Sequence, residues 1–144
     1  MPETKIDWVN PLTKRELRAL NIFGLSSCRY TRLYGQQSED NSQGDHLAVM
    51  PSLEAGIHAS IDEIRDHYLT FGFLVPYTFG NIWSGDKLKM YGVRLAQVMR
   101  VAPMVPVSFK VSGDLLLRAC AIMENGDPCR NITPGFFGQF INEY

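Results

Sequence analysis

The stretch VPVSFKVSGDLLLRACAIM, residues 105–123, constrains the fold more than any other part of the chain. Val105, Val107, Phe109 and Val111 alternate with other residues, and a nearly continuous apolar run follows the Ser-Gly-Asp triplet. Alternation with a period of two is typical of a half-buried strand, and a short apolar run is typical of a central strand. Because glycine beside aspartate is typical of a tight turn, the pattern predicts a β-hairpin.

Similar Gly-Asp triplets at Ser84–Asp86 and Asn125–Asp127 divide the rest of this half of the chain. The apolar segment FLVPYTFGNIW, residues 73–83, contains proline and glycine, which indicates an edge strand or an irregular extended segment. Residues 87–102 fit two structures: the spacing of the apolar side chains matches a helix, whereas Gly92 and the β-branched residues allow a strand. We favour a strand for the second half of that range, and we predict an antiparallel meander over residues 73–124.

Two capping boxes predict two helices before the meander. Thr13 with Glu16, and Ser60 with Glu63, have the spacing at which each side chain satisfies a free amide of the first helical turn. Residues 36–45 contain no apolar side chain, so we expect an exposed polar loop there. The predicted fold is therefore a single α+β domain over residues 1–144: an antiparallel β-meander of about four or five strands, two short helices and an aromatic carboxy-terminal segment.

Composition argues against several classes of protein. With 45% hydrophobic and 20% charged residues the chain is typical of a globular domain, and a net charge of −1 provides no overall field toward nucleic acid. No apolar run approaches the roughly 20 residues of a membrane span, and the opening segment MPETKIDWVN has no apolar core typical of an export signal. We expect a cytoplasmic or virion-associated protein that is not secreted.

No motif of metal or nucleophilic chemistry is present. His58 with Asp62, and Glu63 with His67, have the i,i+4 spacing of helical ligand pairs, but the same spacing serves ordinary surface ion pairs. The three cysteines, Cys28, Cys120 and Cys129, show no CxxC spacing, so buried or incidental thiols are expected. We predict neither a metal nor a cofactor.

Aromatic and basic residues instead indicate binding. The tail GFFGQFINEY either closes the core or forms an exposed apolar surface, and lysines and arginines recur through the predicted meander. The hypothesis is a non-catalytic interaction or assembly protein, such as a viral or phage structural component or a surface-occupying inhibitor, with a protein or itself as the partner. Nucleic acid is the less favoured partner. The candidate interaction residues are Trp83, Phe136, Phe137, Phe140, Lys87, Lys89, Arg94 and Arg100.

A second hypothesis comes from a resemblance. The triplet Leu33-Tyr34-Gly35, the segment GIHAS leading into a helix and the apolar stretch YGVRLAQVMRV resemble the opening pattern of ADP-ribosyltransferase-like domains. The resemblance implies a small NAD-using enzyme in which an arginine holds the dinucleotide, a serine follows and a glutamate acts on the ribose. The positions that it assigns to these roles are Arg29 or Arg32, then Ser60, then Glu124 or Glu143.

Overall fold

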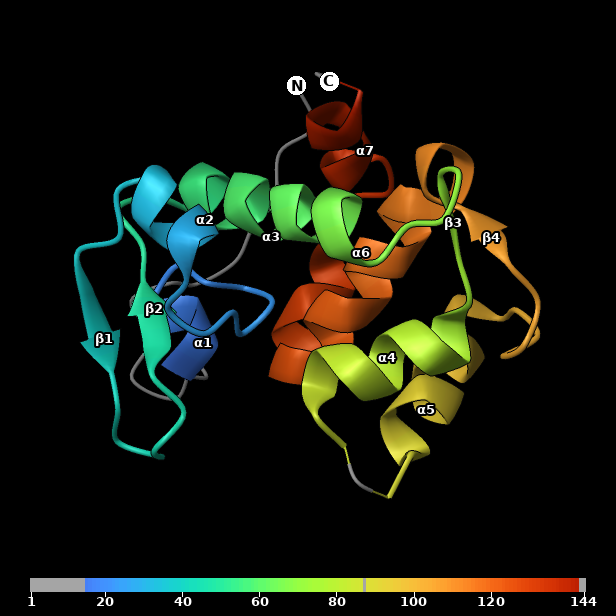
Figure 1. Ribbon diagram of the computed structural model, residues 1–144, viewed down its shortest axis with the longest axis horizontal. Coiled ribbons are helices and arrows are strands. Elements are labelled where there is room, and N and C mark those ends of the chain that lie inside the picture. Colours follow the sequence, from blue (N-terminus) through green and yellow to red (C-terminus); the bar gives the residue numbers. More distant parts are fainter. Residues whose placement is uncertain (1–14, 87, 143–144) are drawn as a thin grey trace.

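The computed structural model describes residues 15–86 and 88–142, and in that part of the chain the fold is helical. Seven α-helices and one 3₁₀ helix form most of the described chain, and two small sheets of two strands each lie at its edges (Figure 1). The helices are α1 (Arg15–Arg18), α2 (Arg29–Leu33), α3 (Leu53–His67), α4 (Pro76–Ser84), α5 (Met90–Met99), α6 (Phe109–Asn125), η1 (Asp127–Asn131) and α7 (Phe136–Ile141). The predicted four- or five-stranded meander is therefore wrong.

The largest correction concerns the predicted hairpin, because its second half forms the longest helix, α6. Ser108 is the cap, and its side chain accepts a hydrogen bond from the amide of Val111 at 3.3 Å. Buried positions then recur at helical spacing, with Phe109, Gly113, Leu116 and Cys120 among them. The Ser-Gly-Asp triplet lies inside the first turns of this helix and forms no turn between strands.

Two further segments predicted as extended are also helical. Residues 73–83 form a strand only over β3 (Phe73–Leu74) before α4 begins at Pro76, where the missing amide of proline costs nothing. The range left open at 87–102 contains α5, so the preference for a strand in its second half is wrong. Pairing helices α4 and α5 requires glycine, since a Cβ on Gly92 would lie 2.1 Å from the carbonyl oxygen of Tyr77.

The two sheets are short and antiparallel. β1 (Ser38–Asp40) pairs with β2 (Leu47–Val49), so a strand lies inside the polar segment 36–45. β3 pairs with β4 (Val107–Ser108), with Phe73 opposite Ser108 and Leu74 opposite Val107. The β3–β4 pair therefore joins the start of α4 to the start of α6.

Helix α3 lies between two apolar clusters. It extends from Leu53 with Ser52 as its cap, so it begins before the capping box predicted at Ser60. Thr13 of the other capping box lies outside the described residues. Ile57, Ile61 and Ile64 face the main cluster around α6, whereas Ala59 faces a smaller cluster near α2 and β2. Figure 1 shows α6 in the centre of the molecule, with α3 passing above it and α4 and α5 below. None of the helices in the described ranges is long and apolar enough to cross a membrane.

Candidate functional site

The aromatic tail lies in the core. Phe136, Phe137 and Phe140 are buried in the main cluster, where the ring of Phe137 packs 5.3 Å from that of Phe23. Because these side chains are covered by the chain itself, they form no exposed surface in this structure. Trp83 is half-buried, and its ring lies 5.5 Å from Phe79.

The predicted basic residues lie on helix α5 and its ends, and not on a sheet face. Lys89, Arg94 and Arg100 are exposed, whereas Lys87 lies outside the described residues. Lys89 and Arg100 flank α5 in left-handed conformations. These cations therefore surround a short helix and do not line a groove with aromatic side chains.

The residues of the ADP-ribosyltransferase resemblance are not brought together. Arg29 is exposed on α2, where its guanidinium donates to the hydroxyl of Tyr30 at 2.6 Å, and Arg32 is exposed on the same helix. Ser60 is completely buried within α3. Glu124 lines a different cavity near the end of α6, and Glu143 lies outside the described residues.

The histidines and aspartates of α3 fix helix α2 in place. The hydroxyl of Tyr30 donates to Asp66 at 2.7 Å and contacts Nε2 of His67 at 2.9 Å. One turn further, the hydroxyl of Tyr34 donates to Asp62 at 2.6 Å. Tyr30 lies within α2 and Tyr34 directly after its last residue, and the two aspartates lie four residues apart on α3, so this segment is joined to α3 twice along one face. Among the described residues no group of three or more histidine, cysteine or acidic side chains is arranged to hold a metal ion.

Two of the three cysteines lie in the core. Cys120 and Cys129 are buried, and burial raises the pKa of the Cys129 thiol to about 12. Cys28 is half-exposed at the start of α2. The three cysteines are free, as the sequence indicated.

An exposed aromatic turn is the most unusual feature of the surface. Thr70 and Phe73 exchange backbone hydrogen bonds of 2.8 and 3.0 Å across a two-residue turn formed by Phe71 and Gly72. Both turn residues have positive φ, 51° and 83°, as in the tight turns that favour Asn-Gly. The side chain of Phe71 is 99% exposed, so it is held on a left-handed backbone without packing against the core.

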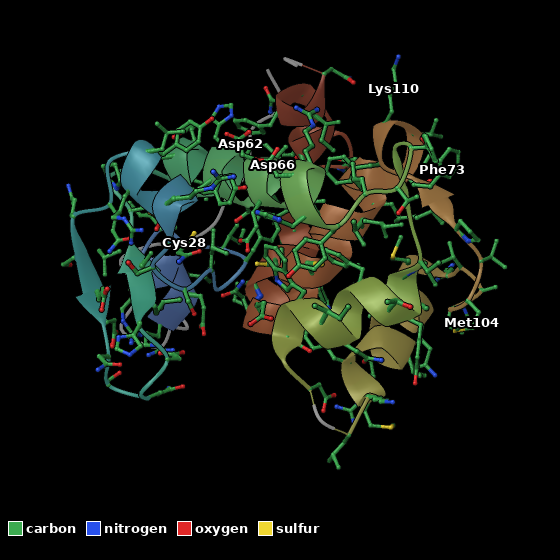
Figure 2. The ribbon with its side chains drawn as sticks, viewed as in Figure 1. Cys28, Asp62, Asp66, Phe73, Met104 and Lys110 are labelled. Atoms are coloured by element: carbon green, nitrogen blue, oxygen red, sulfur yellow. The ribbon has the colours of Figure 1, made fainter. Side chains whose placement is uncertain are left out.

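Cavities flank this turn on both sides. One, of about 530 Å³, lies between the turn and the start of α6, and its lining includes Phe71, Arg65 and Lys110. The other, of about 360 Å³, lies toward α4 and includes His67, Ile82 and Pro106. Phe73 lines both cavities, and neither has an aspartate or glutamate among its described lining residues. We call this region the hairpin surface, defined by Phe71, Phe73, Ile82, Pro106 and Lys110; Figure 2 shows Phe73 and Lys110 on the same side of the molecule.

A third cavity is lined by acidic side chains, in contrast to the two cavities beside the turn. Glu16 on α1, Glu63 on α3 and Glu124 on α6 line a cavity of about 370 Å³, together with Asp45, and its described lining includes no lysine or arginine. The apolar part of its wall includes Phe23, Leu25, Tyr68 and Trp83. We call this cavity, defined by Glu16, Glu63, Glu124 and Trp83, the acidic cleft.

The carboxylates of the acidic cleft differ in their surroundings. Asp45 forms an ion pair with Arg15, which lowers the pKa of that carboxyl group, and Glu124 accepts a hydrogen bond from the hydroxyl of Tyr91 at 2.9 Å. Glu63 is different, because its Oε2 is buried and has no hydrogen-bond partner among the described residues. Burial raises the pKa of Glu63, and the nearby His67 opposes this shift.

Gly24 allows two of the glutamates to approach each other. A Cβ at Gly24 would lie 3.2 Å from Oε2 of Glu124 and 3.7 Å from Cγ of Glu16. The glycine also has a positive φ of 69°, so it is suited to this position both sterically and conformationally. Sequence reasoning missed the cleft because its glutamates come from three helices far apart in the chain.

Comparison with protein-family models, with curated proteins and with solved structures gives no match for this chain.

Proposed function

We propose that the chain is a non-catalytic interaction protein that contacts a protein partner through the hairpin surface. One observation carries the proposal: Phe71 is 99% exposed and has a φ of 51°. A left-handed backbone costs a non-glycine residue about 1–2 kcal/mol, and an exposed side chain recovers none of this through burial in the core. The turn therefore keeps an aromatic side chain that does not stabilise the monomer.

The surroundings of Phe71 are suited to binding. Phe73 and Ile82 are also exposed, at 47% and 61%, and they line the cavities beside it. Aromatic residues are enriched in the centres of protein interfaces, where they fill pockets of the partner, and single lysines are common at the rim. Lys110 lies at the start of α6, at the edge of the larger cavity.

Substitution Phe71→Asn separates binding from folding. Asparagine tolerates the left-handed conformation and is the preferred residue before glycine in such turns. We expect the free energy of unfolding, measured by urea denaturation, to be about 1 kcal/mol higher in the variant than in the parent chain. Binding to the partner should be lost. A variant that is both less stable and still able to bind would contradict the proposal.

Site-specific photo-crosslinking measures the binding directly. A benzoylphenylalanine at position 71 should form a crosslinked adduct of discrete mass with the protein partner. A second copy of the chain counts as such a partner. The matched control is position 33, because Leu33 is 73% exposed on helix α2, far from the turn in the sequence. Adducts at both positions alike, or at neither, would show that Phe71 marks no binding surface.

A further inference from the structure

We propose that the occupant of the hairpin surface is a second copy of this chain, and that the turn of one copy inserts into the acidic cleft of the next. The inference rests on the proposed function, because it uses the same surface and names its partner. It also assigns a role to the acidic cleft, which the proposed function leaves unused.

Charge complementarity is the first argument. The cavities of the hairpin surface are lined by Arg65, His67 and Lys110 without an acidic residue. The acidic cleft is lined by four carboxylates, and Arg15 offsets part of their charge because it pairs with Asp45 and lies 4.0 Å from Glu16. The formal net charge of the whole chain is only −1, so an attraction between copies must come from these local differences in charge and not from the chain as a whole. Opposite local potentials attract two copies, whereas like surfaces repel each other.

The apolar parts of the two surfaces also match. Phe71 projects from the turn, and the wall of the acidic cleft includes Phe23, Leu25 and Trp83. Phe23 and Leu25 are already covered, at 1% and 7% exposed, so a phenylalanine ring that enters the cleft would pack mainly against the half-buried Trp83. Lys110 would then lie close to Trp83 and the glutamates, where an ammonium group is attracted both by the aromatic face and by carboxylates.

Glu63 provides an independent indication that the cleft accepts a donor. Its Oε2 is buried without a hydrogen-bond partner among the described residues. Buried polar atoms are normally paired, and an unpaired one reduces stability. A lysine ammonium carries three donors and no acceptor, so Lys110 of a second copy could supply the missing bond.

The geometry of α6 makes the contact head-to-tail. Lys110 lies in the first turn of this helix and Glu124 in its last, so their backbones are separated by about 21 Å at 1.5 Å per residue. The helix dipole adds positive potential at the hairpin end and negative potential at the cleft end. Because the two surfaces differ, each pair of copies leaves one hairpin surface and one cleft free, and assembly continues into a ring or a filament.

The test mixes two variants that each disable one surface. Phe71→Asn with Lys110→Glu removes the hairpin surface, and Glu16→Gln with Glu63→Gln neutralises the cleft. Size-exclusion chromatography with light scattering follows the mass over a hundredfold range of concentration. We expect the parent chain to grow in mass with concentration and to shrink with added salt, and each variant alone to be a monomer.

Mixing the variants should allow one contact for each pair of molecules, because one variant keeps an intact cleft and the other keeps an intact hairpin surface. The expected product is a 1:1 dimer that does not grow further. Arg94→Glu is the control charge reversal, because Arg94 is exposed on α5 and lines neither cavity; it should assemble like the parent chain. Circular dichroism establishes that every variant is folded, and Lys110→Ala replaces any hairpin variant that is not.

Each outcome decides the question. A parent chain that stays monomeric at every concentration, or a mixture of variants that stays monomeric, overturns the head-to-tail contact. If position 71 then crosslinks to a different protein, the proposed function stands and only this inference fails. If position 71 crosslinks to nothing, both fail together.

Discussion

The glycine contact between helices α4 and α5 gives a prediction with a defined magnitude. In Gly92→Ala the new Cβ would lie 2.1 Å from the carbonyl oxygen of Tyr77 and 2.8 Å from its carbonyl carbon. Ordinary contact begins at 3.4 Å, so the two helices must separate by more than about 1 Å. Overpacking costs about 1–3 kcal/mol, and contact with rigid backbone places this site at the upper end. The helix propensity of alanine returns about 1 kcal/mol, so we expect a net loss of about 2 kcal/mol.

Urea denaturation followed by circular dichroism measures the loss, and Gly138→Ala is the matched control. Gly138 is also helical, but its added Cβ would meet only Asp114, at 3.6 Å. The control should therefore gain about 0.5–1 kcal/mol from the alanine. If Gly92→Ala is as stable as the control, helices α4 and α5 do not pack at this distance. The position given for Ile82 of α4 in the hairpin surface is then also wrong.

Two other perturbations test the interior and the cleft. Asn125→Ala removes a buried amide that donates to the carbonyl oxygen of Ile22 at 2.7 Å. Because this oxygen would be left without a donor, the free energy of unfolding should fall by about 1–3 kcal/mol. An unchanged urea midpoint would show that the hydrogen bond is absent. For Glu63→Gln the effect on stability depends on pH. Folding raises the pKa of Glu63, so the contribution of this carboxyl group to stability is present below its unfolded pKa of 4.5 and is lost as the pH rises through its folded pKa. The variant should therefore melt at a higher temperature than the parent chain at pH 7 and at the same temperature at pH 4, and a constant difference at both pH values would contradict the burial of this carboxylate.

The periodicities in the sequence were real, but residues 105–123 satisfy two of them. Alternation before the Ser-Gly-Asp triplet matches a strand, while Phe109, Gly113, Leu116 and Cys120 recur at helical spacing through the triplet. In the helix, Gly113 leaves room for Ile141 of α7, because a Cβ there would lie 2.5 Å from Cδ1 of that side chain. A glycine kept for close packing inside a helix cannot be told from a turn glycine in one sequence.

Local signals also led to the wrong start of helix α3. Ser60 and Glu63 satisfy the spacing of a capping box, but Ser52 performs the capping, with its hydroxyl accepting from the amide of Ala55 at 3.1 Å. The helical spacing of Ile57, Ile61 and Ile64 extends across Ser60, and burial of all three in one cluster outweighs the local cap. The tertiary core therefore sets this boundary.

The candidate site, like the meander, was not predicted from the sequence, and the reason is physical. The acidic cleft joins α1, α3 and α6, so only the folded chain brings Glu16, Glu63 and Glu124 to one cavity. By contrast, Phe71 followed by Gly72 was visible as an aromatic residue before a glycine, although its exposure and its left-handed backbone were not.

The separation of core and surface explains how the chain can hold an exposed aromatic turn. The main cluster is closed by Phe137 and α7, and its buried side chains do not include Phe71. Changes at the turn therefore alter the surface without opening the core, so a loss of binding caused by Phe71→Asn need not come from unfolding. The helices around α6 in turn fix the positions of the hairpin surface and the acidic cleft relative to each other, which the proposed contact between two copies requires.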